Sequence, residues 1–260
     1  LDPNNALHPF LKRTPRGGLY FYSLSTGLAP LDDLFVRKAL AHGVDMSTII
    51  KAVLGAQDDA TPGPITKFLA CNDPDFAGAT YDPGLARQFL TESTYGSADN
   101  LPVLRVDLYA ATRVTIAVAT KEYWKDNLGI ELDLLKRESG MPRRPEAQFY
   151  RISTGSGTPD PTVLLSFLAR TDSIESLSNI PGGFPVMDAL VATARELRLD
   201  DPGRCPAWNA VEDEYMEKVY MIPLTEVQGV KWVVQPWLIG FAGSYNFDFA
   251  TMATAYIAKH

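Results

Sequence analysis

Hydrophobic and polar positions along the chain follow two periods. In the stretch DDLFVRKALAHGVD, which starts at Asp32, apolar or small residues recur at i, i+3, i+4, i+7 and i+8 from Val36. This period predicts an amphipathic helix, and Asp32 or Asp33 is placed to cap its first turn. In the stretch IELDLL, which starts at Ile130, apolar residues alternate with acidic ones, and this alternation predicts a half-buried strand.

The same two periods, with turn and capping residues between them, predict the other elements. Further helices are expected at Asp45–Val53, Tyr81–Ser93, Thr112–Asn127, Thr162–Ala169, Phe184–Leu199 and Pro202–Val219. Further strands are expected at Leu19–Thr26, Leu101–Tyr109 and Gln148–Ile152, and a closing strand pair around Gly229 at Ile222–Val227 and Val230–Val234. Strands that alternate with helices indicate an α/β fold with a mixed sheet flanked by helices.

Composition limits the classes of partner. The 260 residues are 46% hydrophobic, which is enough for a sizeable core in one large domain or two small ones. The net charge of −7 repels nucleic acid and anionic membranes, so we expect no nucleic-acid partner. No apolar run approaches the roughly 20 residues that a membrane-spanning helix needs.

The stretch STGSGTPDPTVLL, from Ser153 to Leu165, raises the possibility of a phosphate-binding loop. That loop needs Lys-Ser/Thr after its glycines, whereas here Pro159 and Pro161 remove backbone N–H donors from the cradle. The sequence also has no GxSxG or HExxH motif, and its three histidines lack partners at metal-ligand spacing. We therefore expect no catalytic machinery, no metal and no cofactor.

Cys71 and Cys205 are the only cysteines. They are either free buried thiols or, in an oxidising compartment, one disulfide. We favour free thiols because nothing local forces the pairing.

The order of the segments resembles the family 5 solute-binding proteins of bacterial ABC transporters. The resemblance is carried by APLDDLFVRKALAHGVD, YDPGLARQFLTES, WKDNLGIEL, PDP, PVMDALVATARE and VQPWLIGF, which follow one another over nearly the whole chain. It implies a two-lobed receptor that closes on its ligand without bond chemistry and presents the ligand to membrane permease subunits. The implied fold is one periplasmic-binding-protein-like lobe of such a receptor, and the chain is expected to be a monomer.

The resemblance also implies where ligand binds. In this family a peptide pairs as an added strand with the stretch after the QFYRI-like strand, where a Trp-x-x-Asp holds the free amine. The implied ligand-binding residues of this chain are Tyr22, Arg151, Ser153, Thr154, Gly155, Ser156, Gly157 and Asp160.

Several of these positions depart from the family pattern. Thr154 stands at the Trp position and Gly157 at the Asp position, and Ser139 replaces a further Trp. Asp160 is the nearest carboxylate, but its place in PDP indicates a helix cap. These departures predict a ligand that lacks a free amine at the usual place or is not a peptide. Arg151 is expected either to contact the ligand or to form a surface ion pair.

The family is about twice as long as this chain, so the resemblance implies a fragment. Residues 1–18 are expected to be an irregular lead-in, 19–234 the ligand-binding lobe, and 235–260 a segment that returns toward the missing lobe. We expect a periplasmic or envelope-anchored protein that captures peptides or a related small solute. The alternatives are a sensor or chaperone-like binding module not coupled to transport and an uncharacterised hydrolase.

Overall fold

The computed structural model describes residues 4–13, 17–54, 60–109, 114–138, 144–156, 158–173, 183–226, 231–239, 242–243, 250–251 and 256–258. The helices are the 3-10 helices η1 (His8–Phe10) and η2 (Ala98–Asn100) and the α-helices α1 (Leu34–His42), α2 (Met46–Leu54), α3 (Pro83–Glu92), α4 (Val114–Leu128), α5 (Thr162–Leu168), α6 (Pro185–Glu196) and α7 (Arg204–Glu217). The strands are β1 (Leu11–Arg13), β2 (Gly18–Leu24), β3 (Leu104–Tyr109), β4 (Leu132–Arg137), β5 (Phe149–Gly155), β6 (Met221–Glu226), β7 (Lys231–Val233), β8 (Leu238–Ile239), β9 (Ala242–Gly243), β10 (Ala250–Thr251) and β11 (Tyr256–Ile257).

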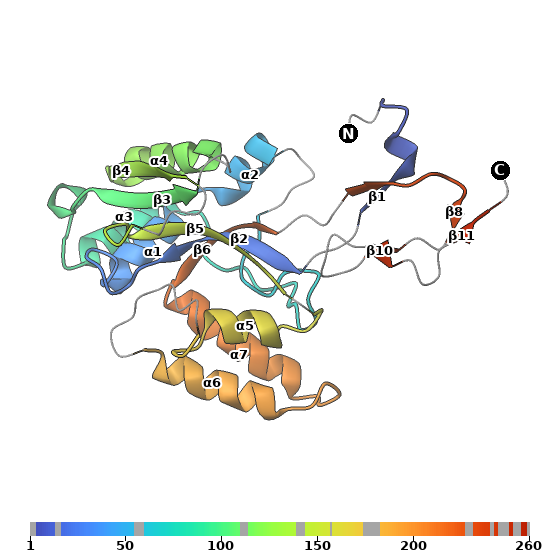
Figure 1. Ribbon diagram of the computed structural model, residues 1–260. Coiled ribbons are helices and arrows are strands. Elements are labelled where there is room, and N and C mark those ends of the chain that lie inside the picture. The colour runs from blue at the N-terminus through green and yellow to red at the C-terminus, as the bar shows by residue number, and fades with distance from the viewer. Residues whose placement is uncertain are drawn as a thin grey trace.

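A five-stranded mixed sheet in the order β4-β3-β5-β2-β6 forms the centre of the described chain (Figure 1). Strand β3 runs parallel to β4 and β5, whereas β2 runs antiparallel to β5 and β6. The predicted α/β fold with a mixed sheet flanked by helices is therefore confirmed.

Helices cover both faces of the sheet, and β2 shows why. Tyr22 and Leu24 pack into one hydrophobic cluster with residues of α1, α2, α3 and α4. Leu19 and Phe21, on the opposite face of the same strand, pack into a second cluster with residues of α5, α6 and α7. The alternation of side chains along a strand thus divides the core into two layers.

Local capping signals set the helix boundaries as predicted. The Asp33 carboxylate accepts hydrogen bonds from the backbone N–H groups of Phe35 and Val36 and begins α1. Asp82 accepts one from Leu85 and begins α3, and Gly129 follows α4 with φ of 73°.

The closing strand pair predicted around Gly229 is wrong. Strand β6 pairs with β2 at the edge of the sheet, and β7 pairs antiparallel with β1. Every β6 residue is buried or half-buried, as suits a strand of the central sheet, whereas Val233 in β7 is 45% exposed. Gly229 itself lies outside the described residues.

The lead-in 1–18, expected to be irregular, contains η1 and β1. The domain boundaries at residues 18 and 234 stay predictions. No helix in the described part of the chain is long and apolar enough to span a bilayer.

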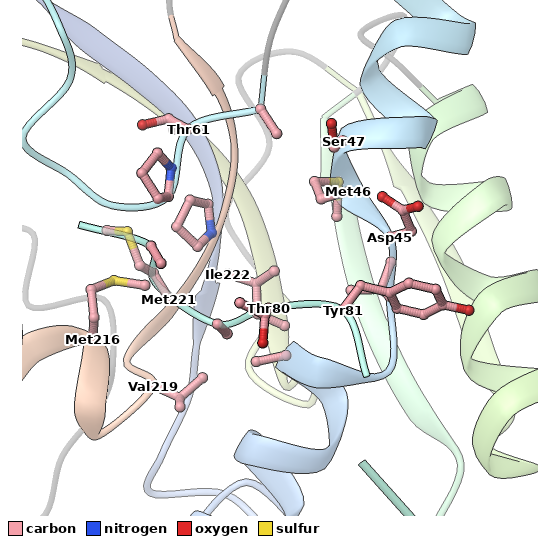
Figure 2. A pocket seen from close by; sticks show the side chains of 17 residues that line it. Asp45, Met46, Ser47, Thr61, Thr80, Tyr81, Met216, Val219, Met221 and Ile222 are labelled. Carbon is pink, nitrogen blue, oxygen red and sulfur yellow. The ribbon is translucent and has the colours of Figure 1, made fainter. Parts of the chain in front are cut away.

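The segment 60–81 connects α2 to α3 and has no helix or strand of its own, as predicted for most of its length. It lies beside β6, and a cavity opens between this segment, α2 and β6 (Figure 2).

Candidate functional site

Strands β2 and β5 bring most of the predicted ligand-binding residues together. Their antiparallel register runs from Gly18↔Gly155 to Leu24↔Phe149 and places Arg151 opposite Tyr22. Among the described residues, β3 pairs with β5 only through Phe149 and Tyr150. Within the described residues, the half of β5 from Ile152 to Gly155 therefore forms strand pairs with β2 only, along one of its two edges.

Gly18 is a site residue that the sequence reasoning missed. A Cβ atom at Gly18 would lie 2.4 Å from the carbonyl oxygen of Thr154 and 2.7 Å from the Cα atom of Gly155. Only glycine fits this close approach of the two backbones. The Gly17-Gly18 pair directly before an apolar run is the signal that could have revealed it.

Arg151 and Tyr22 lie on one face of the sheet, but their environments differ. The guanidinium carbon of Arg151 lies 4.3 Å from the centroid of the Tyr20 ring, a cation–π arrangement, and the side chain is half-buried. Tyr22 is only 3% exposed, and burial raises the pKa of its hydroxyl to about 12, against smaller opposing effects of Thr120 and Arg151. The structure thus places Tyr22 in the core, directly beside the exposed edge.

The stretch after β5 forms a compact turn, which we call the PDP turn (Ser156 and Thr158–Pro161). The buried Ser156 hydroxyl reaches the carbonyl oxygens of Thr158 and Asp160 at 2.5 and 3.2 Å. The backbone N–H of Ala70 donates to the Pro159 carbonyl at 2.6 Å. Ser153 and Gly155 are exposed next to this turn, and Gly157 lies outside the described residues.

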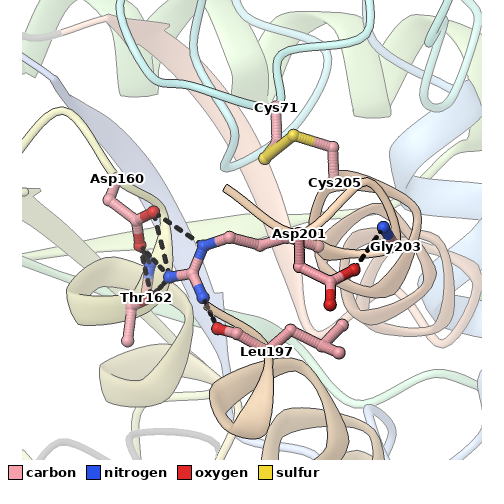
Figure 3. Close-up of a disulfide and its surroundings, with 8 residues drawn as sticks. Cys71, Asp160, Thr162, Leu197, Asp201, Gly203 and Cys205 are labelled. Carbon is pink, nitrogen blue, oxygen red and sulfur yellow. Dashed lines mark hydrogen bonds and ion pairs between the residues drawn. A yellow bond between two sulfur atoms is a disulfide. The ribbon is translucent and has the colours of Figure 1, made fainter. Parts of the chain in front are cut away.

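Asp160 is held by an ion pair that the sequence did not reveal. Its two carboxylate oxygens accept hydrogen bonds from Arg204 Nη2 and Nε at 2.9 to 3.1 Å (Figure 3). It also accepts the backbone N–H of Thr162, the first residue of α5, although the N-cap of α5 is Pro161 and not Asp160 as the sequence indicated. Burial alone would raise the pKa of Asp160, but the hydrogen bonds from Arg204 and Thr162 outweigh it and lower the pKa. The Asp160 carboxylate therefore has a structural role, since it joins the PDP turn to α5 and α7.

Cys71 and Cys205 form a disulfide, so the expectation of free thiols is wrong (Figure 3). Their Cα atoms are 4.7 Å apart although 134 positions separate them in sequence. The N–H of Ala70 that bonds to the PDP turn precedes Cys71, and Arg204 precedes Cys205. The disulfide thus ties the segment 60–81 to the start of α7 beside the PDP turn.

Two buried glutamates, one in α7 and one in β6, accept hydrogen bonds from backbone N–H groups of the segment 60–81. Glu212 Oε1 accepts the backbone N–H of Ile65 at 2.8 Å, and Glu226 Oε1 accepts that of Lys67 at 3.0 Å. The Lys67 ammonium also lies 3.2 Å from the Glu226 carboxylate. Burial raises the pKa of Glu212 to about 7, and the charges of Asp213 and Asp73 add to this, against the opposing hydrogen bond from Ile65.

Replacing Glu212 with Gln is expected to stabilise the chain at pH 8 by on the order of 2–3 kcal/mol. The raised pKa means that ionised Glu212 destabilises the fold, so wild-type stability falls as the pH rises from about 4.5 to about 7. Gln can still accept the Ile65 N–H but carries no charge. Urea unfolding at pH 5 and pH 8 tests this. The gain is expected at pH 8 and not at pH 5, and Glu196→Gln on the exposed face of α6 is the matched control. An equal effect at both pH values would contradict the prediction.

The described residues contain no group of three His, Cys, Asp or Glu side chains placed to hold a metal ion. The candidate site consists of the edge of β5, the Arg151 side chain on the Tyr20 ring and the PDP turn. An arrangement of this kind can bind an extended ligand by main-chain pairing and charge.

A family model described as bacterial extracellular solute-binding proteins, family 5 Middle, matches residues 2–175. The periplasmic murein peptide-binding protein MppA of Escherichia coli (strain K12) is 27% identical over 265 residues, covering 95% of this chain and 47% of MppA. The periplasmic oligopeptide-binding protein OppA of the same strain is 23% identical, covering 93% of this chain and 45% of OppA.

Solved structures agree in fold. The chain superposes on a periplasmic oligopeptide-binding protein of Borrelia burgdorferi (OppAIV) with a TM-score of 0.77 and 21% identity, over 95% of this chain and 50% of that one. The unliganded open form of MppA gives a TM-score of 0.75 and 23% identity, over 96% and 49%. The chain therefore spans about half the length of the curated relatives it matches. On the family match over residues 2–175, which confirms the resemblance seen in the sequence, this chain belongs to the bacterial extracellular solute-binding proteins of family 5.

Proposed function

We propose that this chain is one lobe of the substrate-binding component of an ABC importer, which captures peptides or a related small solute without chemical conversion. The observation that carries the proposal is the edge of β5 from Ile152 to Gly155, which among the described residues forms strand pairs with β2 alone and where Ser153 and Gly155 are exposed. An extended ligand can add to such an edge through main-chain hydrogen bonds. The names of MppA and OppA, both peptide-binding proteins, support the ligand class.

The other lobe belongs, in this proposal, to a part of the protein outside this chain. Residues 19–234 would form the lobe with the β5 edge, and residues 235–260 would return toward the second lobe. The coverage of about half of each relative supports this division. The disulfide supports an oxidising location such as the periplasm, because disulfides persist there and are rare in the cytosol.

A thermal-shift screen of the complete receptor against peptides, amino-acid derivatives and sugars tests the binding role. At least one class is expected to raise the Tm, since a ligand that binds only the folded state stabilises it by mass action. The chain of residues 1–260 alone is expected to bind that ligand weakly or not at all, because closure needs both lobes. No shift with any class, or micromolar binding by the isolated chain in calorimetry, would contradict this model.

Replacing Arg151 with Met in the complete receptor tests whether Arg151 contacts the ligand. If the guanidinium pairs with a ligand carboxylate, affinity is expected to fall about 10- to 100-fold, the value of a charged hydrogen bond. Arg195→Met, on the exposed face of α6, is the matched control and is expected to leave the affinity unchanged. Unchanged affinity of Arg151→Met would mean that Arg151 does not contact the ligand.

Transport coupling is tested separately, in cells. Deletion of the gene is expected to abolish uptake of the ligand found in the screen. Unchanged uptake would favour a binding protein that does not serve an importer.

A further inference from the structure

A cavity of about 360 Å³ lies between β6, the start of α2 and the segment 60–81, at the β6 edge of the sheet (Figure 2). Strand β2 separates β6 from β5 in the sheet order. The cavity shares no lining residue with the predicted ligand-binding set. It is therefore a different place in the molecule from the proposed ligand edge.

The cavity walls are mostly apolar and rich in methionine. The buried side chains that line them are Ala41, Val44, Met46, Met216, Val219, Met221 and Ile222, with Thr61 as the one buried polar side chain among them. Figure 2 shows Met216 and Met221 on one side of the cavity and Met46 on the α2 side. Thioether side chains are flexible and polarizable, so these walls can adapt to an apolar ligand of irregular shape. The volume lies in the range of small-molecule sites.

Contacts with the side chain and backbone of His42 hold the outer wall in place. His42 Nδ1 lies 2.7 Å from the Thr80 carbonyl oxygen, and the Asp82 N–H donates to the His42 carbonyl at 3.0 Å. Gly78 has φ of 59° and rests against Pro62, whose carbonyl oxygen would lie 2.3 Å from a Cβ atom. Only glycine fits there, so the segment has one defined path over the cavity.

Val219, at the inner wall, has an unusual backbone conformation. Its φ is 49°, in the left-handed region that a β-branched residue rarely adopts. This conformation turns the chain from α7 into β6 and places a valine side chain at the cavity. Strained residues of this kind gather at binding sites, where the surrounding structure holds them.

The charge of the lining selects the ligand class. Among the described residues that line the cavity, Asp45 is the only Asp, Glu, Lys or Arg. Its carboxylate accepts hydrogen bonds from the Thr48 N–H and hydroxyl at 2.9 and 2.7 Å, which fix its position, and its remaining lone pairs can accept more. Figure 2 shows the Tyr81 ring on the same side of the cavity as Asp45. A carboxylate and an aromatic ring at the end of an apolar cavity suit an ammonium group.

We propose that this cavity binds a small apolar molecule that carries one ammonium group, with its apolar body among Met46, Met216 and Met221 and its ammonium at Asp45. The site is independent of the β5 edge and of the ligand proposed there. The single carboxylate of the lining and the apolar, methionine-rich walls carry the assignment.

Methyl NMR of the chain with ¹³C-methyl methionine tests the proposal, with 2-phenylethylamine as the probe. The chain has six methionines, so the spectrum is simple. Resonances of Met46, Met216 and Met221 are expected to shift in a saturable way. Met187, which is buried in the cluster with α5 and α6, is the internal control and is expected not to move. The anion 3-phenylpropionate, similar in shape, is expected to shift none of them.

Two variants complete the test. Asp45→Asn keeps a residue that caps helices well but removes the charge, and is expected to weaken binding of the amine about fivefold. Ala79→Trp places a large side chain into the cavity from an exposed position and is expected to abolish the shifts, whereas Ala189→Trp on the exposed face of α6 is not. The proposal is overturned if the amine shifts none of the three resonances, if Met187 moves as far as they do, or if the anion or Asp45→Asn gives equal binding.

Discussion

Replacement of both Cys71 and Cys205 with serine is expected to lower the free energy of unfolding by about 3–5 kcal/mol. The disulfide closes a loop with a sequence separation of 134 residues, and a crosslink that closes a long loop removes much entropy from the unfolded chain. It also joins the segment 60–81 to the start of α7, so its loss frees both partners. Urea unfolding measures the effect.

The control for this prediction is chemical reduction. Dithiothreitol is expected to lower the urea-unfolding midpoint of the wild-type chain to that of the double serine variant. The midpoint of the variant is expected to stay unchanged. Equal midpoints for the oxidised wild type and the variant would mean that the disulfide adds nothing to stability. A wild type insensitive to dithiothreitol, with the midpoint of the variant, would mean that the bond does not form.

Local patterns predicted the elements of this fold well because each signal acts within a few residues. Asp33 caps α1 through N–H groups two and three positions away, and the last four residues of IELDLL begin β4, where Leu132 is buried and Asp133 is exposed. The PDP motif marked the start of α5, since Asp160 bonds to the N–H of Thr162.

Long-range partners could not be predicted from such signals. Arg204 lies 44 positions from Asp160, and Cys205 lies 134 positions from Cys71, so no spacing rule joins either pair. The same limit explains the error about β7. A strand pattern describes which residues are buried but does not name the neighbouring strand.

Buried carboxylates were the least predictable feature of the site. Acidic residues on a helix usually face solvent, yet Glu212 in α7 is 2% exposed, and Glu226 in β6 is 7% exposed. Each accepts a backbone N–H from the segment 60–81, which has no strand or helix to satisfy these donors. The two carboxylates can be placed only once the folded path of the segment 60–81 is known, because that path decides which backbone N–H groups need an acceptor.

Replacement of Arg204 with Met is expected to cost about 3–5 kcal/mol of unfolding free energy, because it leaves the Asp160 carboxylate in a half-buried place without its cation. The ion pair is largely shielded, with the Arg204 and Asp160 side chains 9% and 19% exposed. Since these residues join the PDP turn to α7, the variant also loosens the turn that follows the β5 edge. Urea unfolding and ligand affinity in the complete receptor measure the two effects.

The pH dependence separates this ion pair from a packing effect. The folded-state pKa of Asp160 is lowered, so the stabilisation by the pair is complete above the unfolded pKa of about 3.9 and is lost as the pH falls through the folded value. The difference in unfolding free energy between wild type and Arg204→Met is therefore expected to be constant from pH 5 to 8 and to close in stronger acid.

Arg198→Met removes the exposed pair with Asp200, whose side chains are 85% and 77% exposed, and is expected to have almost no effect. The double variant Asp160→Asn with Arg204→Met is expected to recover part of the loss, because no buried charge then lacks its partner. A gap that persists unchanged in acid would assign the role of Arg204 to contacts other than the ion pair, namely its hydrogen bonds to the Leu197 carbonyl and the Thr162 hydroxyl and its packing on Trp208, whose ring centroid lies 6.0 Å from the guanidinium.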